Sequence, residues 1–175
     1  ALAAADFDRD GDVDLFVGGR VIPGQWPLAA SSKLYRNETG QLVDVTAQVA
    51  PGLNNLAMVT GAIWLDIDND ADSDLLLATE WGPVHLFRND TGTLVQSTQE
   101  AGLQTWLGLW TGLTAGDFDR DGSLDLALGA PSGVSVYRNV DGQLQPYASD
   151  SLLRKALGVR WADVRGDGTL QLIVV

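Results

Sequence analysis

Short apolar segments alternate with polar, glycine-containing turns along the whole chain. The clearest stretch predicts four strands, at about 57–65, 73–78, 84–88 and 93–96. Within it, the run Leu75-Leu76-Leu77 is typical of a strand that is buried on both faces. No window has the 3.6-residue period of a long helix, and only short helical turns are expected, near 46–49 and 99–103. The pattern therefore predicts an all-β fold.

An aspartate-rich segment recurs four times, each time directly after an expected strand. Its copies begin at Asp6, Asp66, Asp117 and Asp163, so successive starts lie 60, 51 and 46 residues apart. A second motif follows the first three copies and consists of an apolar residue, Tyr or Phe, Arg and Asn, with Gly three residues after the Asn. Because Asn and Gly tolerate positive φ, this motif predicts a β-hairpin.

Each repeat thus contains four short strands, which matches the length and pattern of a propeller blade. We predict β-propeller blades of four antiparallel strands, about three and a half of which are present in a single segment, 1–175. The expected blades are about 1–56, 57–105 and 106–155, followed by a half blade at 156–175. Because a closed ring needs more blades, we expect the chain to be part of a longer propeller, with open edges that could pair with other chains.

The aspartates are arranged as ligands of a cation. Counting the first Asp of a copy as position 1, the first three copies have carboxylates at positions 1, 3, 5 and 9. Position 2 is apolar, and position 6 is Gly, which permits positive φ, except for Ala71 in the second copy. The backbone carbonyl of position 7 would add a further oxygen. Oxygen donors without His or Cys favour calcium over zinc or copper. Magnesium is less favoured because it demands tighter octahedral geometry and keeps its waters, so we expect about three calcium ions.

The expected metal-binding residues are Asp6, Asp8, Asp10, Asp12 and Asp14 in the first loop, Asp66, Asp68, Asp70, Asp72 and Asp74 in the second, and Asp117, Asp119, Asp121, Ser123 and Asp125 in the third. An Ala at positive φ costs about 1 kcal/mol, so the loop that contains Ala71 is expected to bind more weakly. The fourth copy has Arg165 at position 3 and Gln171 at position 9, and we predict no calcium there. One hypothesis is that Arg165 replaces the ion by pairing with Asp163 or Asp167.

Composition excludes several classes of function. The formal net charge is −12, from 23 acidic and 11 basic residues, which excludes a general nucleic-acid binder. No apolar run is long enough to insert into a membrane, and the absence of Cys excludes disulfides and thiolate metal sites. The chain begins without Met or a basic leader, and we expect a mature or excised piece. One histidine, His85, does not suggest a Ser-His-Asp triad, and no catalytic residue is predicted.

Two strings carry a family resemblance: GAIWLDIDNDADSDLLLA, from Gly61, and LYRNETGQLVDVTAQVAPGL, from Leu34. They resemble the FG-GAP and VCBS repeats of integrin α-subunit propellers and secreted bacterial proteins, most of all the type found beside the ASPIC/UnbV domain. The resemblance covers nearly the whole chain. It implies a propeller of about seven blades, calcium in the loop between the first two strands of a blade, and an extracellular, periplasmic or cell-surface location.

The tryptophans fall into two groups. Trp64 and Trp161 each lie two residues before a loop, and this shared position predicts packing between blades. Trp26 and Trp81 instead lie in connections after a second strand, at one end of the propeller. They could form a ligand surface that stacks on a sugar or anchors a partner, or they could pack locally.

We expect a calcium-stabilised extracellular module for binding, adhesion or scaffolding, whose protein or glycan partner is unknown. An enzyme is less favoured than a non-enzymatic module, because the only repeated polar constellation is the ion loop. Two alternatives stay open: the propeller part of a secreted carbohydrate-active enzyme, and a lectin-like glycan binder. A pocket with clustered ionisable residues would favour the enzyme.

Overall fold

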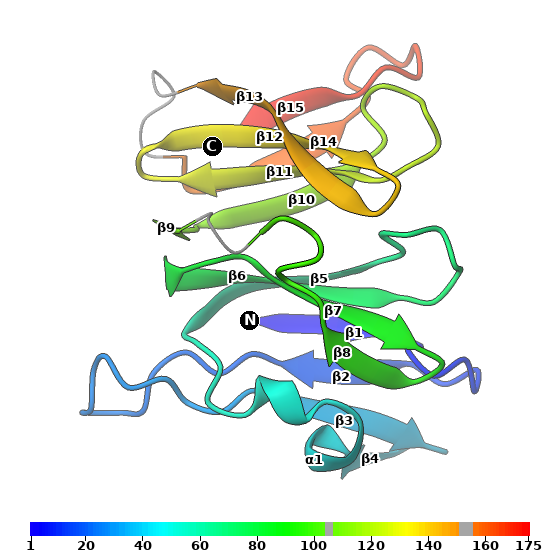
Figure 1. Cartoon of the computed structure of the whole chain (residues 1–175), viewed down its shortest axis with the longest axis vertical. Coiled ribbons are helices and arrows are strands. Elements are labelled where there is room, and N and C mark those ends of the chain that lie inside the picture. The colour runs from blue at the N-terminus through cyan, green and yellow to red at the C-terminus, as the bar shows by residue number, and fades with distance from the viewer. Residues whose placement is uncertain (104–106, 151–155) are drawn as a thin grey trace.

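Four antiparallel sheets follow one another along the chain and stack face to face (Figure 1). They are seen in a computed structural model that describes residues 1–103, 107–150 and 156–175. The first sheet contains β1 (Leu2–Ala5), β2 (Asp14–Val17), β3 (Lys33–Glu38) and β4 (Gln41–Asp44). The second contains β5 (Val59–Leu65), β6 (Asp74–Gly82), β7 (His85–Asp90) and β8 (Thr93–Gln96).

The third sheet contains β10 (Gly112–Gly116), β11 (Asp125–Ala130), β12 (Gly133–Val140) and β13 (Gln143–Asp150), and the fourth only β14 (Val159–Ala162) and β15 (Gln171–Val174). A two-residue strand, β9 (Gly108–Leu109), pairs with the end of β6 and so extends the second sheet. Each full sheet is a meander in which neighbours in sequence pair with one another. The predicted all-β architecture of propeller blades is confirmed.

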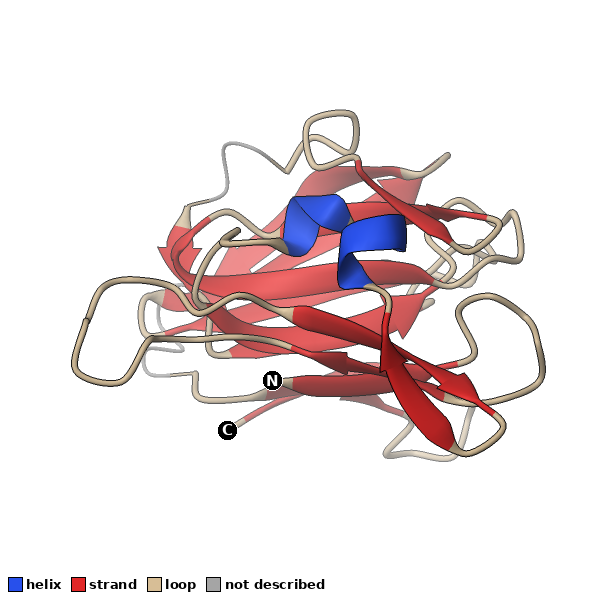
Figure 2. Cartoon of the chain, turned by 90° about the horizontal axis from the view of Figure 1, so that it is seen from below, coloured by secondary structure: helices blue, strands red, loops and turns tan. Residues whose placement is uncertain are grey.

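Helical structure among the described residues is confined to one connection. α1 (Thr46–Val49) and the 3₁₀ helix η1 (Pro51–Leu53) lead from the first sheet to the second (Figure 2). The short helix predicted at 46–49 is therefore confirmed. The helical turn expected near 99–103 is present as a single turn: the Ala101 amide donates to the Ser97 carbonyl at 3.1 Å, an i→i−4 bond, and Gly102, with a φ of 78°, ends the turn.

The core lies between the sheets, in separate layers on the two faces of the second sheet. Leu75 and Leu77 pack toward the first sheet, whereas Leu76 packs toward the third. All three side chains have no exposed area, so the predicted burial on both faces is confirmed. Because each layer is shared by two sheets, shortening one of these leucines to Ala would cost about 2–5 kcal/mol and loosen both sheets.

The same hairpin register places all four aspartate-rich loops at one end of the stack, the right-hand side of Figure 1. In every sheet the residue before the loop pairs with loop position 9. The four pairs are Ala5 with Asp14, Leu65 with Asp74, Gly116 with Asp125, and Ala162 with Gln171. Each sequence repeat thus forms one sheet, and each sheet has its aspartate-rich loop at the same end of the stack.

Candidate metal centres

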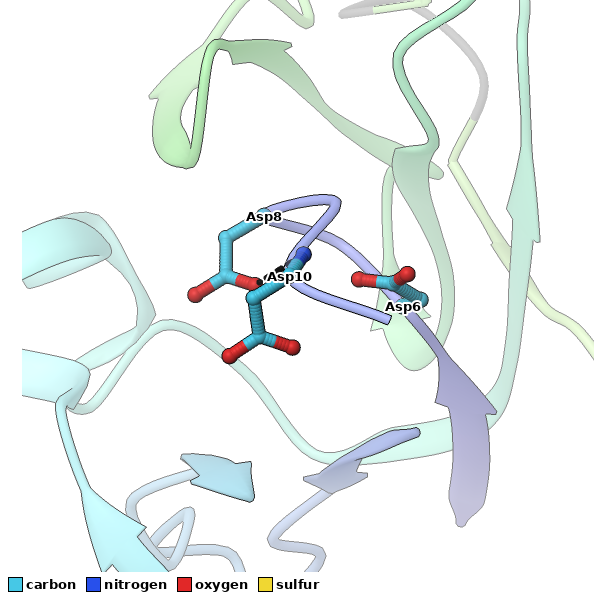
Figure 3. A group of neighbouring side chains, drawn as sticks. All are labelled: Asp6, Asp8 and Asp10. Carbon is cyan, nitrogen blue, oxygen red and sulfur yellow. Dashed lines mark hydrogen bonds between the residues drawn. The ribbon is translucent and has the colours of Figure 1, made fainter. Parts of the chain in front are cut away.

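The first three loops each gather carboxylates around one point. The sets are Asp6, Asp8 and Asp10; Asp66, Asp68 and Asp70; and Asp117, Asp119 and Asp125. Within each set, one carboxylate oxygen per residue lies within 4.8 Å of the others. Figure 3 shows the first set, carried by the loop that follows β1.

Backbone hydrogen bonds to position 1 curl each loop. The position 6 amide donates to the position 1 carboxylate over 3.0 Å from Gly11 to Asp6, 2.9 Å from Ala71 to Asp66, and 3.1 Å from Gly122 to Asp117. Ala71 has a φ of 72°, so the positive φ expected at that position is confirmed.

Position 4 is also left-handed, and sequence reasoning missed it. The residues there are Arg9, Asn69 and Arg120, with φ values of 61°, 61° and 65°. Arginine does not signal this conformation, and only Asn69 is a residue type enriched there. The curl of each loop therefore depends on two left-handed positions, one of which was visible in the sequence.

The position 9 aspartates are the most buried members of the site. Asp14, Asp74 and Asp125 are at most 1% exposed. Desolvation raises the pKa of all three carboxyls, and that of Asp74 to about 6. Backbone amides partly oppose this change; for Asp74 they come from Ile67 and Asn89, at 2.9 and 2.7 Å. A nearby cation would favour the charged form of these carboxylates.

Two carboxylate oxygens provide the strongest test of whether a cation fits. Oδ1 of Asp6 and Oδ1 of Asp68 are buried and have no hydrogen-bond partner among the described residues. Leaving such an oxygen unpaired is costly, on the order of 1–3 kcal/mol or more for a charged group. A hard cation in the loop would satisfy both, and the all-oxygen donor set matches calcium. The residues present therefore fit calcium.

The side chains at position 7 have a different task. Asp12 and Asp72 accept the backbone amides of Thr39 and Thr91, at 3.2 and 3.3 Å. These bonds tie each loop to the hairpin between the third and fourth strands of the same sheet. The position 7 carbonyl, rather than its side chain, is then the candidate ligand. In the third loop, Asp121 lies outside the gathered set and pairs with Arg138, whose Nη2 is 3.0 Å from its Oδ2.

The arginine of the second motif lies beside position 3 in all three loops, which sequence reasoning also missed. Its shortest approaches to the position 3 carboxylate are 4.0 Å from Arg36 to Asp8, 3.4 Å from Arg88 to Asp68, and 2.5 Å from Arg138 to Asp119. The shared Arg was the available signal. Each guanidinium offsets part of the loop's negative charge.

The fourth loop is closed by its own side chains. The amide group of Gln171 accepts from the backbone N–H of Val164 at 2.9 Å and donates to the carbonyl of Thr169 at 2.6 Å. Arg165 is exposed and pairs with no acidic residue of the described chain, so the hypothesis that it replaces the ion is wrong. Arg120 of the third loop supplies the nearby positive charge instead, donating to Thr169 Oγ1 at 2.8 Å.

The tryptophans before the loops stack on the preceding loop. Trp64 lies over Phe7 with ring centroids 6.0 Å apart, and Trp161 lies over Phe118 at 5.5 Å. Their predicted role in packing between blades is confirmed. Trp26 and Trp81 differ: they are 68% and 67% exposed.

Comparison with known families decides the class of the chain. The model of the FG-GAP-like repeat matches residues 66–128 and 117–174, more than half of the chain. This chain belongs to the FG-GAP-like repeat family. The two FG-GAP matches begin at Asp66 and Asp117, the first aspartates of the second and third loops. No curated protein matches the chain.

FG-GAP repeats are consistent with a binding or adhesion-type β-propeller module, and they are typical of extracellular proteins. Of the helices in the described part of the chain, none is long and apolar enough to cross a membrane. The finer resemblance to the type found beside the ASPIC/UnbV domain stays a prediction.

Proposed function

We propose that this FG-GAP chain is a calcium-stabilised binding or adhesion module of an extracellular, periplasmic or cell-surface protein. The observation that carries the calcium assignment is the pair of buried, unpartnered oxygens of Asp6 and Asp68 at equivalent loops. About three ions are proposed, one in each of the first three loops. Side chains at positions 1, 3, 5 and 9 and the position 7 carbonyl would hold each ion.

Comparison of the fourth loop with the first three indicates the structural role of the ion. In the fourth loop, the Gln171 amide binds the position 7 carbonyl and links it to the loop start. In the first three loops the residue at position 9 is an Asp, which has no amide donor for that carbonyl. A calcium ion would supply the missing positive partner. It would join the end of a first strand to the start of the second in each blade.

The opposite end of the stack is proposed to contact the partner. Arg20, in the long connection of the first sheet, binds Glu80 at the end of β6, with Nε 2.9 Å from Oε2. The next residue, Trp81, has a φ of 61° and is 67% exposed. Trp81 lies at the register shift between Glu80 and Gly82 where β6 pairs with β9, so a β-bulge accounts for its left-handed backbone, and its ring is left exposed. Together with Trp26, it is proposed to bind a protein or glycan.

Thermal unfolding in EGTA and in calcium tests the metal assignment. A ligand present at about 100 times its Kd stabilises by about 2.7 kcal/mol per site, which is roughly 5–10 °C for a chain of this length. We expect the melting temperature to fall by at least that amount in EGTA and to return with calcium. Asp10→Ala should remove one ion from the stoichiometry measured by calorimetry. An unchanged melting temperature in EGTA would contradict the proposal.

Binding to glycan arrays and to candidate proteins tests the partner end. Trp81→Ala and Trp26→Ala should abolish binding and leave calcium stoichiometry and melting temperature unchanged, since both rings are exposed. Trp64→Ala is the matched control that should instead lower the melting temperature. A partner that binds the Trp81 and Trp26 variants as tightly as the unaltered chain would contradict this placement.

A further inference from the structure

One asparagine contacts two successive ion loops. The side chain of Asn89, 2% exposed, donates to the carbonyl of Phe7 in the first loop at 2.6 Å and to that of Ser73 in the second at 3.0 Å. Its backbone N–H donates to the carboxylate of Asp74, position 9 of the second loop, at 2.7 Å. Asn89 therefore bonds to both loops from a single point on β7.

The next junction repeats this arrangement. Asn139 donates through its side chain to the carbonyls of Ile67 and Leu124, at 2.7 and 3.2 Å, and through its backbone N–H to Asp125 at 2.9 Å. The equivalent residue of the first sheet, Asn37, donates through its side chain to Val13 at 3.2 Å, within its own sheet. Among the described residues, two of these asparagines thus link neighbouring sheets, and their counterpart Asn37 does not.

The carbonyl that accepts from Asn89 lies directly before a candidate calcium ligand. The carbonyl of Phe7 belongs to the peptide that joins position 2 to position 3, so fixing it also fixes the backbone that leads into Asp8. A second contact crosses the same junction, since Arg9 Nε lies 2.9 Å from Oδ1 of Asp72 in the second loop. Order in either loop therefore favours order in its neighbour.

We propose that successive calcium sites are positively coupled through Asn89 and Asn139. This inference rests on the proposed function, because it concerns the ions that these loops are proposed to hold. When one ion orders its loop, the hydrogen bond also orders part of the neighbouring loop, so the next ion binds at a smaller entropy cost. By thermodynamic linkage, each ion raises the affinity for the other by the same factor. A single hydrogen bond is worth about 1 kcal/mol, which corresponds to about fivefold in affinity. Asn89 and Asn139 are positioning residues, which act on the ion through the loop backbone.

The test is calcium titration calorimetry of the whole chain. Asp119→Ala removes one of the gathered carboxylates of the third loop and leaves the first two loops to be compared. Adding Asp10→Ala then removes a ligand from the first loop, and we expect affinity at the second loop to fall about fivefold. In an Asn89→Ala background the same Asp10→Ala change should lower the second loop's affinity clearly less, because only the Arg9–Asp72 contact still crosses the junction.

Asn37→Ala is the matched control. Asn37 and Asn89 both accept a hairpin glycine amide, at 2.7 and 2.8 Å, so both variants lose that bond and a bond within their own sheet. Asn89→Ala additionally loses the link to Phe7. The dependence on Asp10 should therefore persist in Asn37→Ala. Equal loss of coupling in both variants would overturn the proposal.

The remaining outcomes are also decisive. If Asp10→Ala does not change affinity at the second loop in the chain with its natural Asn89, the coupling is absent, whether or not Asn89→Ala folds. That result, with calcium still bound, would leave the proposed function intact. A chain that binds no calcium at all would overturn both. Asn139→Ala provides an independent repeat at the second and third loops.

Discussion

Replacing Ala71 by Gly should stabilise the protein. Ala71 occupies position 6 of the second loop with a φ of 72°, where the first and third loops have Gly11 and Gly122 at 94° and 93°. Its amide is already used, donating to Asp66 at 2.9 Å, so the backbone conformation is required by the loop. Ala71→Gly keeps that bond and removes only the Cβ that makes this conformation unfavourable.

The magnitude follows from two opposing contributions. An L-residue in the left-handed region costs roughly 1–2 kcal/mol, which the substitution relieves. Glycine also gives the unfolded chain extra freedom, which opposes folding by about 0.4–1 kcal/mol. The net gain in the free energy of unfolding is therefore about 1 kcal/mol. For a chain of this length, that corresponds to a rise in melting temperature of about 2–4 °C.

Gly122→Ala is the reverse experiment. A Cβ built at Gly122 would meet nothing within 4 Å, so the substitution adds strain at a φ of 93° and no collision. It should lower the free energy of unfolding by about the amount that Ala71→Gly adds. Urea unfolding in calcium measures both. The reasoning is refuted if Ala71→Gly does not raise the free energy of unfolding above that of the unaltered chain. It is also refuted if Gly122→Ala does not lower it.

Two further predictions concern the fourth loop and the buried histidine. Arg165→Asp combined with Gln171→Asp restores both missing ligands and frees the Thr169 carbonyl, so calorimetry should show one more calcium ion than before; unchanged stoichiometry in a folded variant would argue against the ligand assignment. Burial lowers the pKa of His85 from its usual 6.5. The imidazole is therefore protonated more readily in the unfolded state than in the folded state, and the free energy of unfolding should fall as pH drops below about 6.5. His85→Gln should flatten that part of the curve in urea titrations between pH 7 and 5, and parallel curves for the two proteins would contradict the burial effect.

The sequence by itself determined the repeat, the strands and the candidate ligands. These features are local: the strand β8 falls at 93–96 and the short helix α1 at 46–49, the positions predicted for them. Carboxylates at alternate positions before a Gly also curl together within one short loop. Local preference is enough wherever a residue's neighbours in space are its neighbours in sequence.

Only the tertiary structure decided which hydrogen bonds join neighbouring loops and which basic side chain lies beside the fourth loop. Asn89 appeared as a hairpin residue, but stacking of the sheets brings its side chain to Phe7, 82 residues away. Likewise, the charge beside the fourth loop comes from Arg120 and not from Arg165, because the neighbouring loop lies within its reach. Such contacts depend on how whole sheets pack against each other, and a local pattern carries no information about which side chains then meet.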